Sequence, residues 1–82
     1  MRNIYVHNMD IVLMKYTVIL ENGEDGYIIA HVPALKGCHT QGKTKEEALK
    51  NAREAIKLYI ESLKALNKPL PQDTGSEIEV NA

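Results

Sequence analysis

The sequence is poor in cysteine, has no long apolar run and carries no excess of either charge. Its one cysteine, Cys38, makes a disulfide within the chain impossible and favours a reducing compartment such as the cytoplasm. The N-terminal stretch is interrupted by Asn8, Asp10 and other polar residues, so it predicts neither a signal peptide nor a membrane span. Ten Lys and Arg residues are balanced by eleven Asp and Glu, which disfavours a protein that binds nucleic acid through a strongly positive surface.

The residues that are present, 44% hydrophobic and 26% charged, are typical of a soluble globular protein. With 82 residues the chain should form one small domain, because a core of this size buries only a modest share of the unfolded surface. We therefore expect an oligomer or a bound partner to add to its stability.

Three short strands are predicted in the first half of the chain. Residues 15–21 (KYTVILE) are β-branched and aromatic, and every second side chain is apolar. Residues 22–26 (NGEDG) are typical of a hairpin loop, and residues 27–32 (YIIAHV) then predict an antiparallel second strand that ends at a proline. A third strand is predicted over residues 38–41 (CHTQ), closed by a glycine.

One long helix follows. Thr44 and Glu47 form a capping box, which satisfies free backbone amides of the first turn, and the helix should end near Asn67 because Pro69 disfavours helical geometry before it. Its apolar residues fall in one arc of roughly 140°, which should pack on the sheet. They are Ala48, Leu49, Ala52, Ala55, Ile56, Tyr59, Ile60, Leu63 and Leu66. Leu58 lies outside this arc and is a candidate oligomer contact.

The order of these elements predicts an α+β fold in which one helix packs on a three- to four-stranded, mainly antiparallel sheet. Residues 77–80 (EIEV) alternate acidic and apolar side chains and predict an edge strand after the helix, which gives the order β-β-β-α-β. Residues 1–13 are compatible with an extra strand, a partner-binding arm or sequence upstream of the domain, which would occupy residues 14–82.

Catalytic and metal-binding arrangements are not indicated. A thiol enzyme needs a histidine against its cysteine, but neighbours on a strand point to opposite faces, so we expect Cys38 to be half-buried and His39 exposed. With His31 these residues offer at most three zinc ligands and lack a paired spacing. The acidic residues cluster in the loop 22–26 and not at strand centres, where a two-metal nuclease needs them. We therefore expect no enzyme, metal or cofactor. A residual nuclease using His31, His39 or the loop acids is the alternative.

Binding to another protein is the better class of function. Tyr27, Ile29 and His31 alternate on one strand and could form an exposed surface, although a histidine satisfied within the sheet is the ordinary alternative. Leu35, at the corner, and His39, on the third strand, complete the candidate partner-binding residues.

Residues 14–63 closely resemble the N-terminal domain of HicB-like antitoxins. The resemblance rests on the strand YTVILE, a glycine-bearing turn before GYIIAHVPAL, the segment GCHTQG and the capped helix TKEEALKNAREAI. Its most specific part is VPALKGCHTQGKTKEEAL. The resemblance implies a partial ribonuclease-H-like fold that has lost the nuclease carboxylates.

Family members typically neutralise a HicA toxin, a small double-stranded-RNA-binding-like ribonuclease that cleaves messenger RNA with a histidine, by covering its active site. The resemblance thus implies a HicA-like partner and a homo-oligomer, dimer or tetramer. Many members also carry a C-terminal DNA-binding domain, but eleven residues follow Pro71, so we expect no DNA binding. We expect a cytoplasmic, non-enzymatic antitoxin. The alternative is a stand-alone, self-assembling regulatory or ligand-binding module without a toxin partner.

Overall fold

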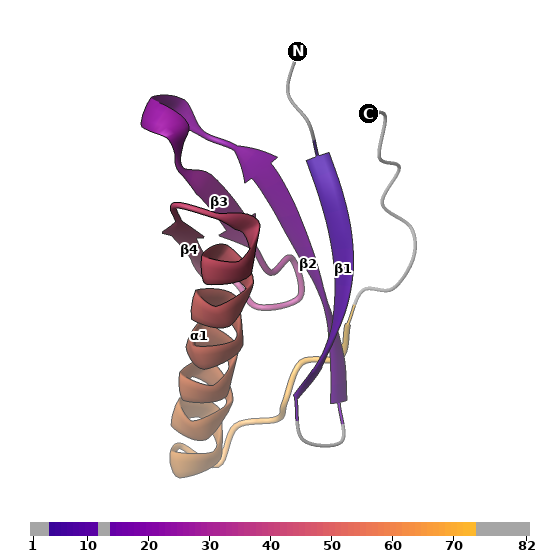
Figure 1. The fold of residues 1–82 in the computed structure, drawn as a ribbon. Helices are drawn as coiled ribbons and strands as arrows, with labels where there is room; N and C mark the ends of the chain where they lie inside the picture. Colours follow the sequence, from indigo (N-terminus) through magenta and orange to yellow (C-terminus); the bar gives the residue numbers. More distant parts are fainter. Residues whose placement is uncertain (1–3, 12–13, 74–82) are drawn as a thin grey trace.

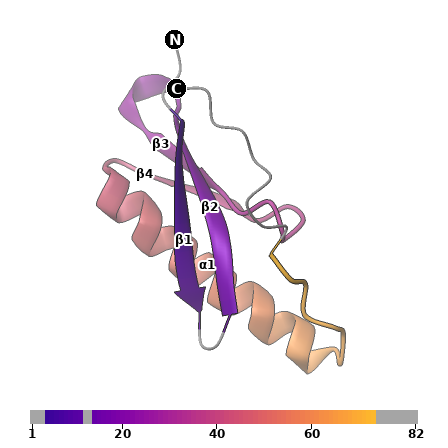
Figure 2. The same ribbon diagram turned by 90° about the vertical axis from the view of Figure 1, so that its right-hand side faces the viewer.

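The computed structural model describes residues 4–11 and 14–73, which form a four-stranded antiparallel sheet with one long helix on one face (Figure 1). The elements are β1 (Ile4–Ile11), β2 (Met14–Asn22), η1 (Glu24–Gly26), β3 (Ile28–His31), β4 (His39–Gly42) and α1 (Lys45–Ala65). The strands lie in the sheet in the order of the sequence, and α1 crosses the sheet obliquely (Figure 2). The predicted α+β class is confirmed.

The order of the elements differs from the expected one. β1 lies in the segment 1–13, for which a strand was one of three alternatives, and it pairs with β2 from Ile4 opposite Glu21 to Ile11 opposite Met14. β1 is therefore the fourth strand of the sheet. It lies at the edge of the sheet next to β2, and in the sequence it precedes the three predicted strands. The strand expected at residues 77–80 lies outside the described residues.

Alternation along the strands separates a buried and an open side of the sheet. On β2, Tyr16, Val18 and Leu20 are completely buried beneath α1. Together with residues of β1, β3, α1 and the turn after β3 they form one apolar core. Its buried members are Met9, Tyr16, Val18, Leu20, Ala30, Val32, Leu35, Ala48, Ala52, Ile56 and Ile60.

α1 begins where the sequence predicts. The Thr44 hydroxyl accepts a hydrogen bond of 3.0 Å from the backbone N–H of Glu47, and the Glu47 carboxylate accepts one of 3.0 Å from the N–H of Lys43. The helix ends two residues before the predicted position. Asn67 has a left-handed φ of 53°, and the N–H of Lys68 donates to the Leu63 carbonyl at 2.9 Å, which is a Schellman motif.

Helix and sheet meet most closely at the start of α1. A Cβ atom on Gly42 would lie 2.4 Å from the backbone nitrogen of Ala48, so the helix rests on a strand position without a side chain. Farther along, the Tyr59 hydroxyl donates to the Lys36 carbonyl at 3.0 Å. The predicted apolar arc is wrong at its end, since Leu66 is 64% exposed. Leu66 follows the last residue of α1 as its C-cap, so it no longer continues the apolar face of the helix.

The segment after α1 returns to the sheet and is hydrogen-bonded to β2. The Tyr16 hydroxyl donates to the Pro71 carbonyl at 2.6 Å. The Asp73 carboxylate accepts hydrogen bonds from the backbone N–H of Thr17 at 2.9 Å and from its hydroxyl at 2.7 Å. Burial, with a smaller contribution from the charge of Asp73, raises the pKa of the Tyr16 hydroxyl above its ordinary value.

Candidate functional site

The side of the sheet opposite α1, which we call the open face, presents two rows of side chains across β2, β3 and β4. In the first row His31 lies between its register partners Ile19 and His39, and in the second Ile29 lies between Glu21 and Gln41. His39 and Gln41 are exposed, and the other four are half-buried. The open face thus consists of Ile19, Glu21, Ile29, His31, His39 and Gln41.

The two histidines of the open face are cross-strand neighbours. The ring centroids of His31 and His39 are 6.2 Å apart, with the planes tilted by 49°. Nε2 of His31 lies 3.6 Å from Oε1 of Glu21, and the two side chains are 45% and 18% exposed. At this exposure the contact is worth little stability. The His31 side chain thus remains accessible on the open face.

A hollow of about 650 Å³ adjoins the open face at the turn between β2 and β3. This hairpin hollow is lined by the acidic residues Glu21, Glu24 and Asp25, and no Lys or Arg of the described ranges 4–11 and 14–73 lines it. Its lining residues are Glu21, Asn22, Gly23, Glu24, Asp25, Tyr27, Ile29 and Gln41. The left-handed φ of 60° at Asp25 and of 79° at Gly26 closes the turn and sets these acidic residues around the hollow.

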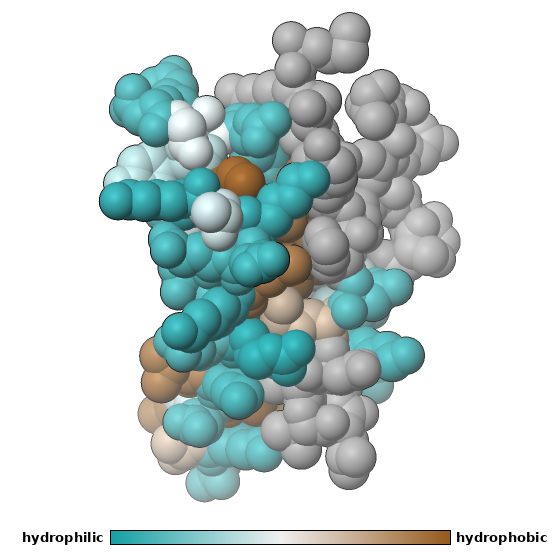
Figure 3. All heavy atoms as spheres, in the orientation of Figure 1, coloured by the Kyte–Doolittle hydropathy of each residue, from teal (hydrophilic) through white to brown (hydrophobic). Residues whose placement is uncertain are grey.

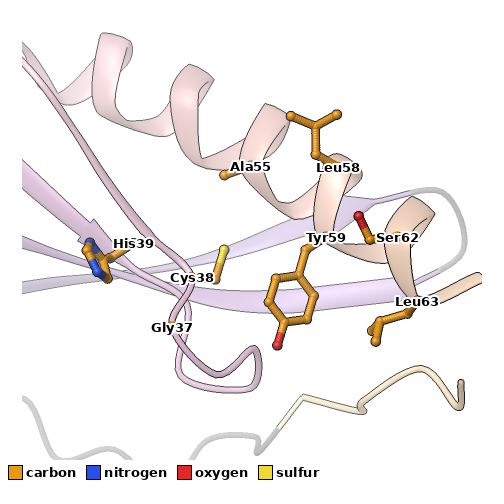
Figure 4. A pocket seen from close by; sticks show the side chains of 8 residues that line it. All are labelled: Gly37, Cys38, His39, Ala55, Leu58, Tyr59, Ser62 and Leu63. Carbon is orange, nitrogen blue, oxygen red and sulfur yellow. The ribbon is translucent and has the colours of Figure 1, made fainter. Parts of the chain in front are cut away.

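A second hollow, the Cys38 groove, lies between α1 and the start of β4 (Figure 4). It has a volume of about 520 Å³. It is lined by Gly37, Cys38, His39, Ala55, Leu58, Tyr59, Ser62 and Leu63. Figure 4 shows Cys38 pointing toward α1 and His39 pointing away from it, as alternation predicts. Burial raises the pKa of the Cys38 thiol, which keeps it protonated and a poor nucleophile.

The structure brings together most of the predicted partner-binding residues. Ile29, His31 and His39 share the open face, and Tyr27 lines the adjoining hairpin hollow. The interpretation of Leu35 as an exposed corner position is wrong, since its side chain is 1% exposed. Its N–H donates to the Val32 carbonyl at 3.0 Å, and this turn directs the side chain into the core.

The loop acids lie in an exposed turn, as the hairpin loop in the sequence predicts. Glu24 and Asp25 also line the hairpin hollow together with Tyr27 and Ile29, which the sequence reasoning did not anticipate. Three acidic residues within five positions, followed by a glycine and a tyrosine, were the available signal. Among residues 4–11 and 14–73, no group of three or more His, Cys, Asp or Glu is placed to hold a metal ion.

Comparison with known proteins identifies the family. The family model described as "HicB_like antitoxin of bacterial toxin-antitoxin system" matches residues 16–81, which is most of the chain. The chain belongs to the HicB-like antitoxin family. The match includes β2 from Tyr16 onward, the hairpin hollow, β3, β4 and α1, so both rows of the open face lie within the HicB-like region. The role of this HicB-like domain is therefore antitoxin-like.

Relatives of the HicB-like chain occur in archaea, bacteria and a phage. A UPF0150 protein of Thermoplasma acidophilum is 61% identical over 69 residues, which cover 84% of this chain and all of the relative. A UPF0150 protein of Synechocystis is 54% identical over 61 residues, 74% of this chain and 77% of the relative. An uncharacterised 14.9 kDa protein of Haemophilus phage HP1 is 37% identical over 68 residues, 83% of this chain and 50% of the phage protein. No solved structure matches the chain.

In the part of the HicB-like chain that the structure describes, no helix combines the length and the apolar character needed to cross a membrane.

Proposed function

We propose that this HicB-like chain binds and neutralises a small HicA-type toxin that cleaves messenger RNA. The observation that carries the proposal is the family match over residues 16–81. In this proposal the chain works in the cytoplasm as a non-enzymatic protein. The toxin supplies the chemistry, and the antitoxin supplies a surface that covers the toxin's active site.

The open face and the hairpin hollow form the surface that we assign to the toxin. Ile19 and Ile29 give it a half-buried apolar centre, and exposed His39 and Gln41 give it a polar margin. An apolar centre with a polar rim is the usual anatomy of a protein interface. Because these side chains stand on paired strands, little freedom is lost when a partner binds.

The charge of the hairpin hollow supports an RNA-binding partner. A ribonuclease must attract a polyanion, and so presents Lys and Arg at its RNA site. The hollow offers Glu24 and Asp25, and the ring of Tyr27 lies beside them, where it can stack on a guanidinium group. We propose that the toxin's basic residues enter this hollow, so that carboxylates take the place of RNA phosphates.

We also propose that the chain acts as a homo-oligomer, dimer or tetramer. A domain of 82 residues has a small core, and association of copies is a common way to stabilise such a domain.

Co-expression tests the partner. The chain would be tagged and expressed together with the protein of the neighbouring open reading frame, and growth and co-purification would be measured. We expect the neighbour alone to stop growth, and the pair to restore growth and to co-purify. Unrestored growth, or purification of the tagged chain alone, would contradict the proposal.

Neutralising two acidic residues tests the surface. Glu24→Gln with Asp25→Asn removes two charges at nearly constant shape, and asparagine tolerates the left-handed backbone of position 25. We expect the toxin dissociation constant to rise by about ten-fold or more, with a weaker dependence on salt. The matched control is Glu54→Gln with Glu61→Gln, the same charge change at exposed positions of α1. Equal affinities for the two double variants would reject the assigned surface.

A further inference from the structure

Two histidines stand side by side on the open face. His31 on β3 and His39 on β4 are register partners, and their ring centroids are 6.2 Å apart. The N–H of Val32 donates to the Cys38 carbonyl at 3.0 Å, and hydrogen-bonded and non-hydrogen-bonded pairs alternate along an antiparallel ladder. His31 and His39 therefore form a non-hydrogen-bonded pair, the kind in which facing side chains lie closer together.

Both rings can be reached from solvent on the same side of the sheet. His39 is exposed, and the side chain of His31 is 45% exposed. The opposite side of the molecule differs, because α1 contains neither histidine nor cysteine. Figure 3 shows that the visible outer surface of this helix is mainly hydrophilic, and its exposed residues are largely Lys, Arg and Glu. A pair of imidazoles is thus a property of the open face.

The spacing of the two rings is close to that of two imidazoles bound to one metal ion. Zinc–nitrogen bonds are about 2.0–2.1 Å long, so the centroids of two rings that share a tetrahedral ion are about 5 Å apart. The centroids of His31 and His39 must therefore approach by only about 1 Å. Because His39 is exposed, rotation about its side-chain bonds can close this gap without moving the strands.

Glu21 is placed to orient one of the two rings. Its Oε1 lies 3.6 Å from Nε2 of His31. A histidine that binds a metal ion through one ring nitrogen commonly donates the N–H of its other nitrogen to a carboxylate, which fixes the ring and strengthens it as a ligand. If Nε2 of His31 donates to Glu21, its Nδ1 is left to bind the ion.

We propose that His31 and His39 bind a divalent transition-metal ion on the open face. Two imidazole nitrogens suit Zn²⁺, Ni²⁺ and Cu²⁺, whereas Mg²⁺ and Ca²⁺ prefer oxygen ligands. The protein supplies two ligands and water the others, because within residues 4–11 and 14–73 no group of three His, Cys, Asp or Glu is placed to hold an ion. Spacing along the sequence did not reveal this pair, since the pairing of β3 with β4 brings the two rings together.

Calorimetric titration of the full chain with zinc chloride, without a polyhistidine tag, tests the site. Loss of even an outer-shell group typically weakens metal binding by about 10–100-fold, so His39→Gln should raise the zinc dissociation constant about ten-fold or more. The matched control is His7→Gln, which makes the same change on β1 and should leave zinc binding unchanged. We expect one ion per unaltered chain. No zinc binding by the unaltered chain, or equal affinities for the unaltered chain and His39→Gln, would overturn the inference.

Histidine ring signals in NMR spectra test whether both rings bind the same ion. On addition of zinc chloride the signals of His31 and His39 should shift in step, while those of His7 stay in place. Magnesium chloride should shift none of them. A shift confined to one ring, or an equal shift of His7, would refute joint binding, and equal shifts with magnesium would contradict the class of ion. Both experiments use the chain alone, so their outcome is independent of whether a toxin partner exists.

Discussion

The close approach of α1 to β4 predicts that Gly42→Ala destabilises the protein substantially. The added Cβ would lie 2.4 Å from the Ala48 nitrogen, 2.8 Å from the Glu47 carbonyl carbon and 2.9 Å from the Ala48 Cα. Favourable contacts between carbon atoms are about 3.5–4.0 Å long, so the overlap is roughly 1 Å. All three neighbours are backbone atoms, which can move only if the first turn of α1 moves with them.

The magnitude follows from two opposing terms. Overpacking of this kind costs about 1–3 kcal/mol, while replacing glycine lowers the entropy of the unfolded chain and restores about 0.4–1 kcal/mol. With rigid neighbours we expect the upper end of the first range, and a net loss of about 2 kcal/mol in the free energy of unfolding. For a domain of this size that corresponds to a fall in Tm of about 8–16 °C.

Urea unfolding followed by circular dichroism measures this loss, and Gly37→Ala provides the control. Gly37 has a left-handed φ of 76° but no atom within 4 Å of its added Cβ, so it should lose only the backbone term of about 1 kcal/mol. Amide hydrogen exchange in the first turn of α1 should accelerate in Gly42→Ala and not in Gly37→Ala. A free energy of unfolding for Gly42→Ala equal to or above that of the unaltered protein would refute the packing described for this contact.

Three further predictions concern the capping and fastening of the chain. Thr44→Ala removes the hydroxyl that accepts a hydrogen bond from the Glu47 N–H, and the free energy of unfolding measured in urea should fall by about 1 kcal/mol. A loss near zero would mean that the helix does not depend on this cap. Asp73→Ala leaves two buried donors of Thr17 without partners and should cost about 2 kcal/mol, and an unchanged midpoint would argue against the fastening of this segment. Because the pKa of the Tyr16 hydroxyl is raised in the folded protein, the unfolded chain loses this proton at a lower pH than the folded protein does. The free energy of unfolding should therefore be unaffected by this group below about pH 10 and should fall as the pH rises above it. In Tyr16→Phe that alkaline fall should be shallower, and an identical profile would contradict the burial of the hydroxyl.

Local signals in the sequence were sufficient for the elements that depend on near neighbours. The β2–β3 hairpin follows from alternation and a glycine-bearing turn, and the start of α1 follows from Thr44 and Glu47, which bond to groups at most four residues away. Strand geometry alone predicted that Cys38 and His39 point in opposite directions, as the structure shows. These features depend on the period of a single element and on its ends.

Features that depend on distant pairing could not be predicted in the same way. The strand character of β1 depends on its register with β2, and the fastening of Thr17 to Asp73 joins residues 56 positions apart. The burial of Leu35 depends on the turn that its backbone makes with Val32. The hairpin hollow needs side chains from three strands and the turn, so a list of loop acids did not reveal it.

We propose that this chain inhibits an RNA-cleaving toxin by occupying its RNA-binding surface through the open face and the hairpin hollow. The most direct measurement is cleavage of a messenger RNA by the purified toxin of the neighbouring open reading frame, with increasing amounts of this chain. We predict that cleavage stops near equal molar amounts, and that Glu24→Gln with Asp25→Asn requires a large excess to achieve the same inhibition. Undiminished cleavage at a large excess of the unaltered chain would contradict the claim.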